Sequence, residues 1–168
     1  MNPTFVVIMG VSGCGKTTAA EQVAETIGGV FLEGDAYHPP ENKAKMGAGI
    51  PLTDEDRRPW FDRLVSEAKE VLAGGQSPVL ACSALKESYR DHLFADIGNH
   101  RLIHLEGSYD LIKARMDARH HEYMTSTLLR SQFATLEAPS PGPETLVLSI
   151  ETSPEDIVED IVAWLEWV

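Results

Sequence analysis

The sequence predicts an α/β fold in three layers, with a five-stranded parallel sheet between two layers of helices. Short apolar runs alternate with segments of helical periodicity along the whole chain, and this alternation is typical of parallel sheets. The chain has 168 residues, of which 43% are hydrophobic and 24% are charged, so a single domain with a sizeable core is expected. No linker or internal repeat divides residues 1–168 into smaller units.

Five short apolar runs predict the strands. In order along the chain, they cover residues 5–9, 30–32, 78–82, 102–105 and 146–150. The first run is apolar at every position, which is typical of a strand covered by helices on both faces.

Apolar residues with helical spacing predict the helices between these strands. The helical segments are 17–27, 39–46, 54–72, 85–94, 109–119, 127–136 and one that begins after residue 153. Gly28 ends the first of them, Thr53 with Asp56 three residues later caps the third, and Ser153 opens the last. Strands and helices in this order predict a parallel sheet with helices on both faces.

Acidic residues outnumber basic ones by 26 to 14, which gives a formal net charge of −12. This charge argues against nucleic acid as the main partner, because phosphate backbones attract basic surfaces. No run reaches the roughly 18 apolar residues that a membrane-spanning helix needs, and the apolar run at residues 5–9 is too short for a signal peptide. A cytoplasmic protein with no membrane segment and with reduced cysteines is therefore expected.

A glycine-rich motif follows the first strand, where residues 10–17 fit the pattern G-x-x-x-x-G-K-[ST] in full. Its backbone can curve around phosphate oxygens, which then accept hydrogen bonds from N–H groups at the start of the next helix. Lys16 is expected to reach the β- and γ-phosphates, and the Thr17 hydroxyl to bind Mg²⁺. The motif predicts a P-loop NTPase fold that binds ATP and Mg²⁺. The predicted nucleotide-binding residues are Gly10, Val11, Ser12, Gly13, Cys14, Gly15, Lys16, Thr17 and Thr18.

Cys14 lies inside this motif and has two interpretations. A small side chain is simply tolerated there, or the helix N-terminus and Lys16 make its thiol sensitive to oxidation.

Residues from several segments are predicted to form the acceptor side of the site, where the molecule that receives the phosphoryl group binds. Asp35 follows the second strand, at the sheet edge where ligands bind in open α/β folds, and its carboxylate can accept the proton of an attacking hydroxyl. Lys86 and Arg90 are four residues apart and are predicted to share a helix face that binds an anion. Arg57 begins another helix, where a cation opposes the macrodipole unless an anion compensates it. Taken singly, Asp35 also fits an ordinary turn, and Lys86 and Arg90 also fit a solvated basic face.

Arg115 and Arg119 form a further pair with helical spacing after the fourth strand. Their guanidinium groups are expected to stabilise the phosphoryl group in transfer. The polar stretch that follows predicts a small mobile lid over residues 116–126.

The chain resembles bacterial-type gluconokinases, which are small P-loop kinases of sugar acids. The matching blocks run in order through nearly the whole chain: the P-loop, Gly34-Asp35 with His38-Pro39, Cys82-Ser83-Ala84-Leu85-Lys86 with Tyr89-Arg90, and Ser131-Gln132-Phe133. The resemblance implies ATP-dependent phosphorylation of D-gluconate at its 6-hydroxyl, an adenylate-kinase-like fold with a moving lid, and a homodimer.

The resemblance also implies roles for individual residues. The implied catalytic residues are Lys16, Asp35, Arg115 and Arg119, and the implied substrate-binding residues are Asp35, His38, Arg57, Lys86 and Arg90.

Two other functions stay open on sequence grounds. One is a shikimate-like or nucleoside-monophosphate-like kinase, which shares the P-loop and differs in its acceptor. The other is a nucleotide switch, for which a guanine motif Asn-Lys-x-Asp is expected. Residues 42–45 approach this motif and lack its final Asp.

Overall fold

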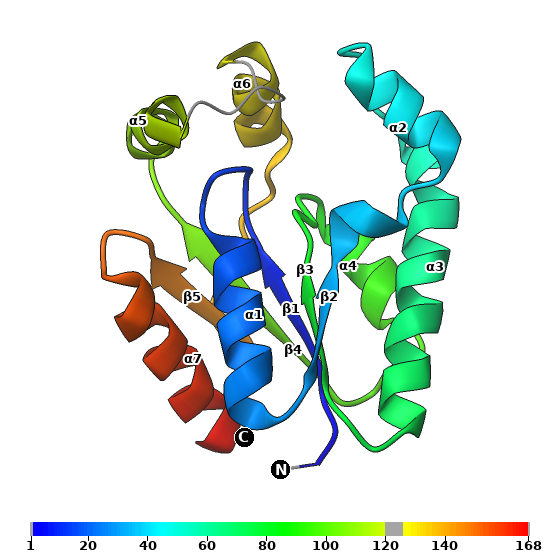
Figure 1. The fold of residues 1–168 in the computed structure, drawn as a ribbon, viewed down its shortest axis with the longest axis vertical. Helices are drawn as coiled ribbons and strands as arrows, with labels where there is room; N and C mark the ends of the chain where they lie inside the picture. Colours follow the sequence, from blue (N-terminus) through cyan, green and yellow to red (C-terminus); the bar gives the residue numbers. More distant parts are fainter. Residues whose placement is uncertain (1, 120–125, 168) are drawn as a thin grey trace.

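The five strands form one parallel sheet in the order β2-β3-β1-β4-β5 (Figure 1). The computed structural model describes residues 2–119 and 126–167, without the side chains of Arg119, Ser126 and Trp167. The strands are β1 (Phe5–Met9), β2 (Val30–Glu33), β3 (Pro78–Ala81), β4 (His100–Glu106) and β5 (Thr145–Ser149). The predicted five-stranded parallel sheet is therefore confirmed, with strand ends shifted by up to two residues.

Every predicted helix is present, and its bounds agree to within two residues. The helices are α1 (Lys16–Ile27), α2 (Pro40–Gly47), α3 (Asp54–Ala73), α4 (Glu87–Phe94), α5 (Tyr109–Arg119), α6 (Ser126–Thr135) and α7 (Pro154–Trp167). One 3₁₀ turn, η1 (Gly34–Tyr37), was not predicted. Among these described helices, none combines the length and apolarity needed to cross a bilayer.

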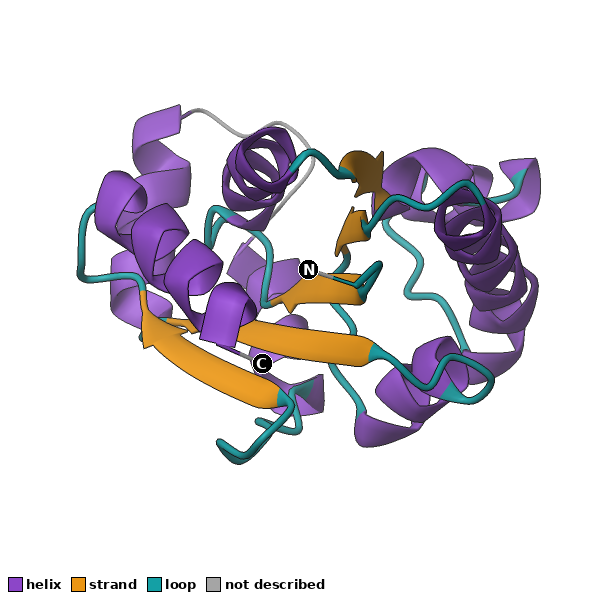
Figure 2. Ribbon diagram, turned by 90° about the horizontal axis from the view of Figure 1, so that it is seen from below, coloured by secondary structure: helices purple, strands orange, loops and turns teal. Residues whose placement is uncertain are grey.

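Helices cover both faces of the sheet, as Figure 2 shows from below. Alternate residues of β1 enter two separate cores: Val6 and Ile8 pack with α1 and α7, whereas Phe5, Val7 and Met9 pack with α3 and α4. All five β1 side chains are fully buried, as expected of a strand that is apolar at every position.

The carboxyl ends of the strands lie along the upper edge of the sheet in Figure 1. The loop after β1, the turn after β2 and the loop after β3 lie together there, because neighbouring strands β2, β3 and β1 run parallel. This edge is the place where open α/β sheets bind ligands.

A capping box fixes the start of α3 beside this edge. The Thr53 hydroxyl accepts a hydrogen bond from the Asp56 backbone N–H at 3.1 Å, and the Asp56 carboxylate accepts one from the Thr53 N–H at 2.9 Å. Lys45 from α2 also donates to Asp56, at 2.9 Å. The Thr53 bond, followed by the Lys45 bond, lowers the pKa of Asp56 to about 2.

We expect Asp56→Asn to lower the free energy of unfolding at neutral pH and to have less effect in acid. Because the folded pKa lies below the unfolded value of about 3.9, the carboxylate stabilises the fold above pH 4. That contribution is lost as the pH falls from about 4 towards about 2. Urea unfolding at a series of pH values measures the difference from wild type.

Glu55→Gln is the matched control, since Glu55 is exposed in the same helical turn. A wild-type to Asp56→Asn difference that stays constant from neutral pH down into this acid range would contradict the assignment.

Candidate active site

The phosphate loop joins β1 to α1 and has a backbone that only glycine suits at one central position. Gly13 has φ +84°, and a Cβ there would lie 2.7 Å from Met116 Cγ of α5. Close packing against α5 therefore holds the loop in its curved form. α1 begins at Lys16, so its first N–H groups point into the loop and favour a bound anion.

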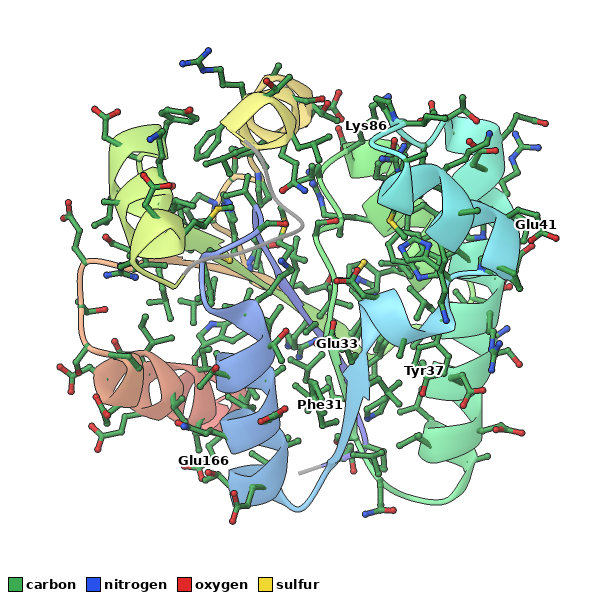
Figure 3. All side chains as sticks on the ribbon, turned by 45° about the horizontal axis from the view of Figure 1, so that its top comes forward. Phe31, Glu33, Tyr37, Glu41, Lys86 and Glu166 are labelled. Carbon is green, nitrogen blue, oxygen red and sulfur yellow. The ribbon has the colours of Figure 1, made fainter. Side chains whose placement is uncertain are left out.

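Thr17 and Glu33 meet beside this loop. The Thr17 hydroxyl donates a hydrogen bond to a Glu33 carboxylate oxygen at 2.6 Å, and Figure 3 shows Glu33 where β2 ends. A hydroxyl and a carboxylate are the hard oxygen ligands that Mg²⁺ prefers, and Mg²⁺ commonly takes one or two such groups together with nucleotide phosphates. The described residues hold no cluster of three or more His, Cys, Asp or Glu side chains suited to a metal.

Both cysteines are buried. Cys14 is 3% exposed and belongs to the core that packs against α1, which favours the packing interpretation over oxidation. Burial raises the pKa of Cys82, the residue after β3, to about 12.

Asp35 is presented to solvent by a turn that is itself held tightly. A Cβ on Gly34 would lie 2.6 Å from the Ala81 carbonyl oxygen, so the turn lies directly against β3. Trp60 of α3 donates its indole N–H to the Gly34 carbonyl at 2.8 Å. The Asp35 side chain is 85% exposed, on the same sheet edge as the phosphate loop.

His38 lies behind Asp35 and is almost fully buried. Its ring stacks on Trp60 with centroids 3.9 Å apart, and its Nε2 is 3.9 Å from an Asp35 carboxylate oxygen. Burial lowers the pKa of His38 below 6.5, with smaller effects from Arg57 and Lys43, although Asp35 opposes this. The Asn42 amide nitrogen, which donates, lies 3.4 Å from His38 Nδ1. A neutral ring that accepts this bond at Nδ1 carries its proton on Nε2, on the side of Asp35.

A second group of polar side chains gathers around Tyr89. Asp54, at the start of α3, accepts a hydrogen bond from the Tyr89 hydroxyl at 2.6 Å and another from Lys86 at 3.3 Å. These bonds, with Tyr89 first, lower the pKa of Asp54. The Arg57 guanidinium and the Lys86 amine lie 5.2 and 5.5 Å from the centre of the Tyr89 ring. Two cations thus lie against one aromatic ring.

Arg57 does not need a ligand to offset its place at a helix start. The first turn of α3 carries three acidic residues, Asp54, Glu55 and Asp56, which compensate the unfavourable interaction with the macrodipole. The guanidinium also donates to the Leu52 carbonyl at 2.6 Å.

Arg90 does not share an exposed face with Lys86. Lys86 is the extended residue before α4, with φ −100° and ψ 147°, so helical i, i+4 geometry does not apply to the pair. Arg90 is 6% exposed and donates to the backbone carbonyls of Ala84, Leu85 and Glu137. The structure directs its guanidinium to these backbone carbonyls.

Arg115 lies on α5, and its guanidinium donates to the Ile150 carbonyl at 2.7 Å. This contact ties α5 to the turn after β5. The side chain of Arg119 lies outside the described residues, as do residues 120–125 of the predicted lid 116–126.

Comparisons with known proteins show which family this chain is similar to. A family model described as an AAA domain matches residues 5–139. The crystal structure of a gluconokinase from Sinorhizobium meliloti 1021 superposes with a TM-score of 0.87, at 42% identity over 98% of this chain and 92% of that one. The gluconokinase of Gluconobacter oxydans (strain 621H) is 41% identical over 162 residues, which are 96% of this chain and 91% of that protein. The chain belongs to the gluconokinase family.

A second relative from the gluconokinase family also matches most of the chain. The thermosensitive gluconokinase of Escherichia coli (strain K12) is 40% identical over 84% of this chain and 75% of its own length. The structure of an APS kinase from Mycobacterium tuberculosis has a TM-score of 0.72 at 17% identity, which shows a shared fold alone.

The sequence alone assigns no individual role to three residues found at or beside the candidate site: Glu33, Asp54 and Gln132. The carboxylate of Glu33 at the end of a strand was a visible signal, because Asp35 was selected on the same ground. Asp54 and Gln132 make contacts with residues 35 and 120 positions away, which no local pattern reveals.

Proposed function

We propose that this protein is an ATP-dependent gluconokinase that transfers the γ-phosphoryl group of ATP to the 6-hydroxyl of D-gluconate, giving 6-phospho-D-gluconate and ADP. The observation that carries the proposal is the position of Asp35 on the same sheet edge as the phosphate loop, with Lys86 and Arg57 beyond it (Figure 3 labels Lys86). This arrangement suits a phosphate donor at one end and a hydroxylated carboxylate at the other.

The residues divide the work of phosphoryl transfer between them. N–H groups at the start of α1 and the Lys16 amine bind the ATP phosphates, while Asp35 orients the 6-hydroxyl and accepts its proton. His38 supports Asp35 through its Nε2–H. Lys86 and Arg57 bind the gluconate carboxylate. On binding, Lys86 leaves its ion pair with Asp54 and pairs with the substrate carboxylate instead.

Mg²⁺, held by Thr17 and Glu33, would neutralise charge on the β- and γ-phosphates when bound. Arg115 and Arg119 are proposed to stabilise the phosphoryl group in transfer, and residues 116–126 to form a lid that excludes water. A cytoplasmic homodimer that serves gluconate utilisation completes the proposal.

An acceptor screen tests the proposed function. Purified protein is mixed with MgATP and, in separate reactions, D-gluconate, shikimate or a nucleoside monophosphate, and ADP release is followed with product mass. Gluconate should give ADP and a product heavier by one phosphoryl group. Turnover with shikimate or a nucleoside monophosphate alone would replace gluconate by that acceptor.

Lys86→Met is expected to raise KM for gluconate by about 10- to 100-fold and to change kcat less. A charge-assisted hydrogen bond to a carboxylate contributes on the order of 1.5–3 kcal/mol, and methionine keeps the side chain's length without its charge. Steady-state kinetics at saturating ATP measures the split between KM and kcat. Lys69→Met is the control, since Lys69 pairs with Asp96 on the surface. An unchanged KM would remove Lys86 from the acceptor site.

A further inference from the structure

The end of α6 contacts the phosphate loop through one side chain. Gln132 Oε1 accepts a hydrogen bond from the Ser12 backbone N–H at 2.8 Å, and Gln132 Nε2 lies 3.2 Å from Ser12 Oγ, to which it donates. The two residues are 120 positions apart, so this pair of bonds exists only in the folded chain. Both polar groups of Ser12 that face α6 are thereby fixed.

The residues just after α6 contact the loop that follows β3. The Glu137 backbone N–H donates to the Leu85 carbonyl at 2.8 Å, and the Glu137 carboxylate accepts from the Glu87 N–H at 2.7 Å, at the first residue of α4. Arg90 completes the attachment by donating to the Glu137 carbonyl at 2.8 Å. Two bonds therefore hold Glu137 to the loop that carries Lys86, and a third holds it to Arg90 of α4.

This acceptor loop, residues 82–87, is backbone-strained at one position. Ala84 has φ +44°, in the left-handed region that residues with a Cβ rarely adopt. The Ala84 carbonyl accepts a hydrogen bond from Arg90 at 2.9 Å, so the same guanidinium that binds Glu137 also stabilises the strained residue. A strained residue persists where its surroundings over-determine it, and such positions concentrate at functional sites.

The two attachments are mechanically continuous. The Leu136 N–H donates to the Gln132 carbonyl at 2.9 Å, which extends the helical bonding up to the residue before Glu137. Leu136 also packs against both cores of the protein. A short hydrogen-bonded segment therefore connects Ser12 to Leu85 and Glu87.

We infer that residues 132–137 couple the phosphate loop to the acceptor loop, with Gln132 and Glu137 as positioning residues at its two ends. A nucleotide bound to the phosphate loop further restrains Ser12 and, through Gln132 and Glu137, the loop that presents Lys86. By thermodynamic reciprocity, an acceptor that orders this loop strengthens nucleotide binding by the same factor. The identity of the acceptor as gluconate rests on the proposed function, whereas the coupling between the loops does not.

Amide hydrogen exchange tests the coupling without any acceptor. Saturating AMPPNP with Mg²⁺ should slow exchange in a peptide covering residues 84–90 of the wild-type protein by about fivefold or more, the lower end of common coupling factors. In Gln132→Met, which keeps length and packing and removes both hydrogen bonds, this protection should be largely lost. Protection of residues 10–18 by the nucleotide should remain. Ser131→Ala, an exposed neighbour on the same helix, serves as the control and should behave as wild type.

Calorimetry tests the other end of the segment. Glu137→Ala removes the acceptor for the Glu87 N–H and keeps the two backbone bonds of residue 137, so it should reduce the effect of gluconate on the Kd of Mg-AMPPNP, while Glu137→Gln keeps an acceptor oxygen and should retain that effect. Absence of nucleotide protection at residues 84–90 in wild type, or its persistence in Gln132→Met, would overturn the inference. Protection that depends on Gln132 in a protein that ignores gluconate would instead uphold the coupling and discard the named substrate.

Discussion

Lys16→Ala is expected to lower kcat/KM for gluconate phosphorylation by on the order of 10²–10³, which is about 3–4 kcal/mol of transition-state stabilisation. Lys16 is the first residue of α1, so its amine and the N–H groups at the helix start act on the same phosphates. Negative charge on the transferring group and the leaving group is greatest in the transition state, and no other residue of the motif supplies a full positive charge there.

The comparison requires evidence that the variant still folds. Circular dichroism should be unchanged, and Lys69→Ala, which removes a lysine on the far part of α3, should keep wild-type kinetics. Turnover by Lys16→Ala within about threefold of wild type would show that the helix start alone carries the charge stabilisation.

Asp35→Asn should reduce kcat by a similar factor, on the order of 10²–10³, with a smaller change in KM. Asparagine keeps the size of the side chain and one acceptor oxygen, and it cannot take the proton of the attacking hydroxyl at neutral pH. The turn itself should persist, because Trp60 bonds to the Gly34 carbonyl and the Asp35 side chain is 85% exposed. Single-turnover kinetics with bound MgATP separates the chemical step from product release.

Asp160→Asn on α7 is the control for loss of one exposed carboxylate, since α7 packs against α1 on the other face from α3. If Asp35→Asn turns over at the wild-type rate, proton acceptance belongs to another group, and Asp35 only orients the substrate.

The fold was predictable because each strand and helix has a recognisable local sequence pattern. The run Phe5–Met9 is apolar at every position, and the capping pair of Thr53 and Asp56 marks the start of α3. The turn Gly34–Tyr37 was not predictable in the same way, because four residues carry no periodicity. Its conformation depends on the distant Trp60 and on the close approach of Gly34 to Ala81.

The site was predictable where its residues are contiguous and less so where they are not. The phosphate loop is one unbroken motif, so residues 10–17 can be recognised from the sequence alone. Arg90 shows the opposite case, since spacing placed it with Lys86 and the structure turns it toward three backbone carbonyls. Helical spacing has meaning only inside a helix, and α4 begins one residue after Lys86.

The stacking of Trp60 on His38 makes the protein's own fluorescence a reporter of the acceptor side. The indole contacts the turn that carries Asp35 through its ring and its N–H, so movement of that turn changes the surroundings of the fluorophore. The other two tryptophans, Trp164 and Trp167, belong to α7 on the opposite face of the sheet. Emission from Trp60 therefore offers an optical signal of substrate arrival in unlabelled protein.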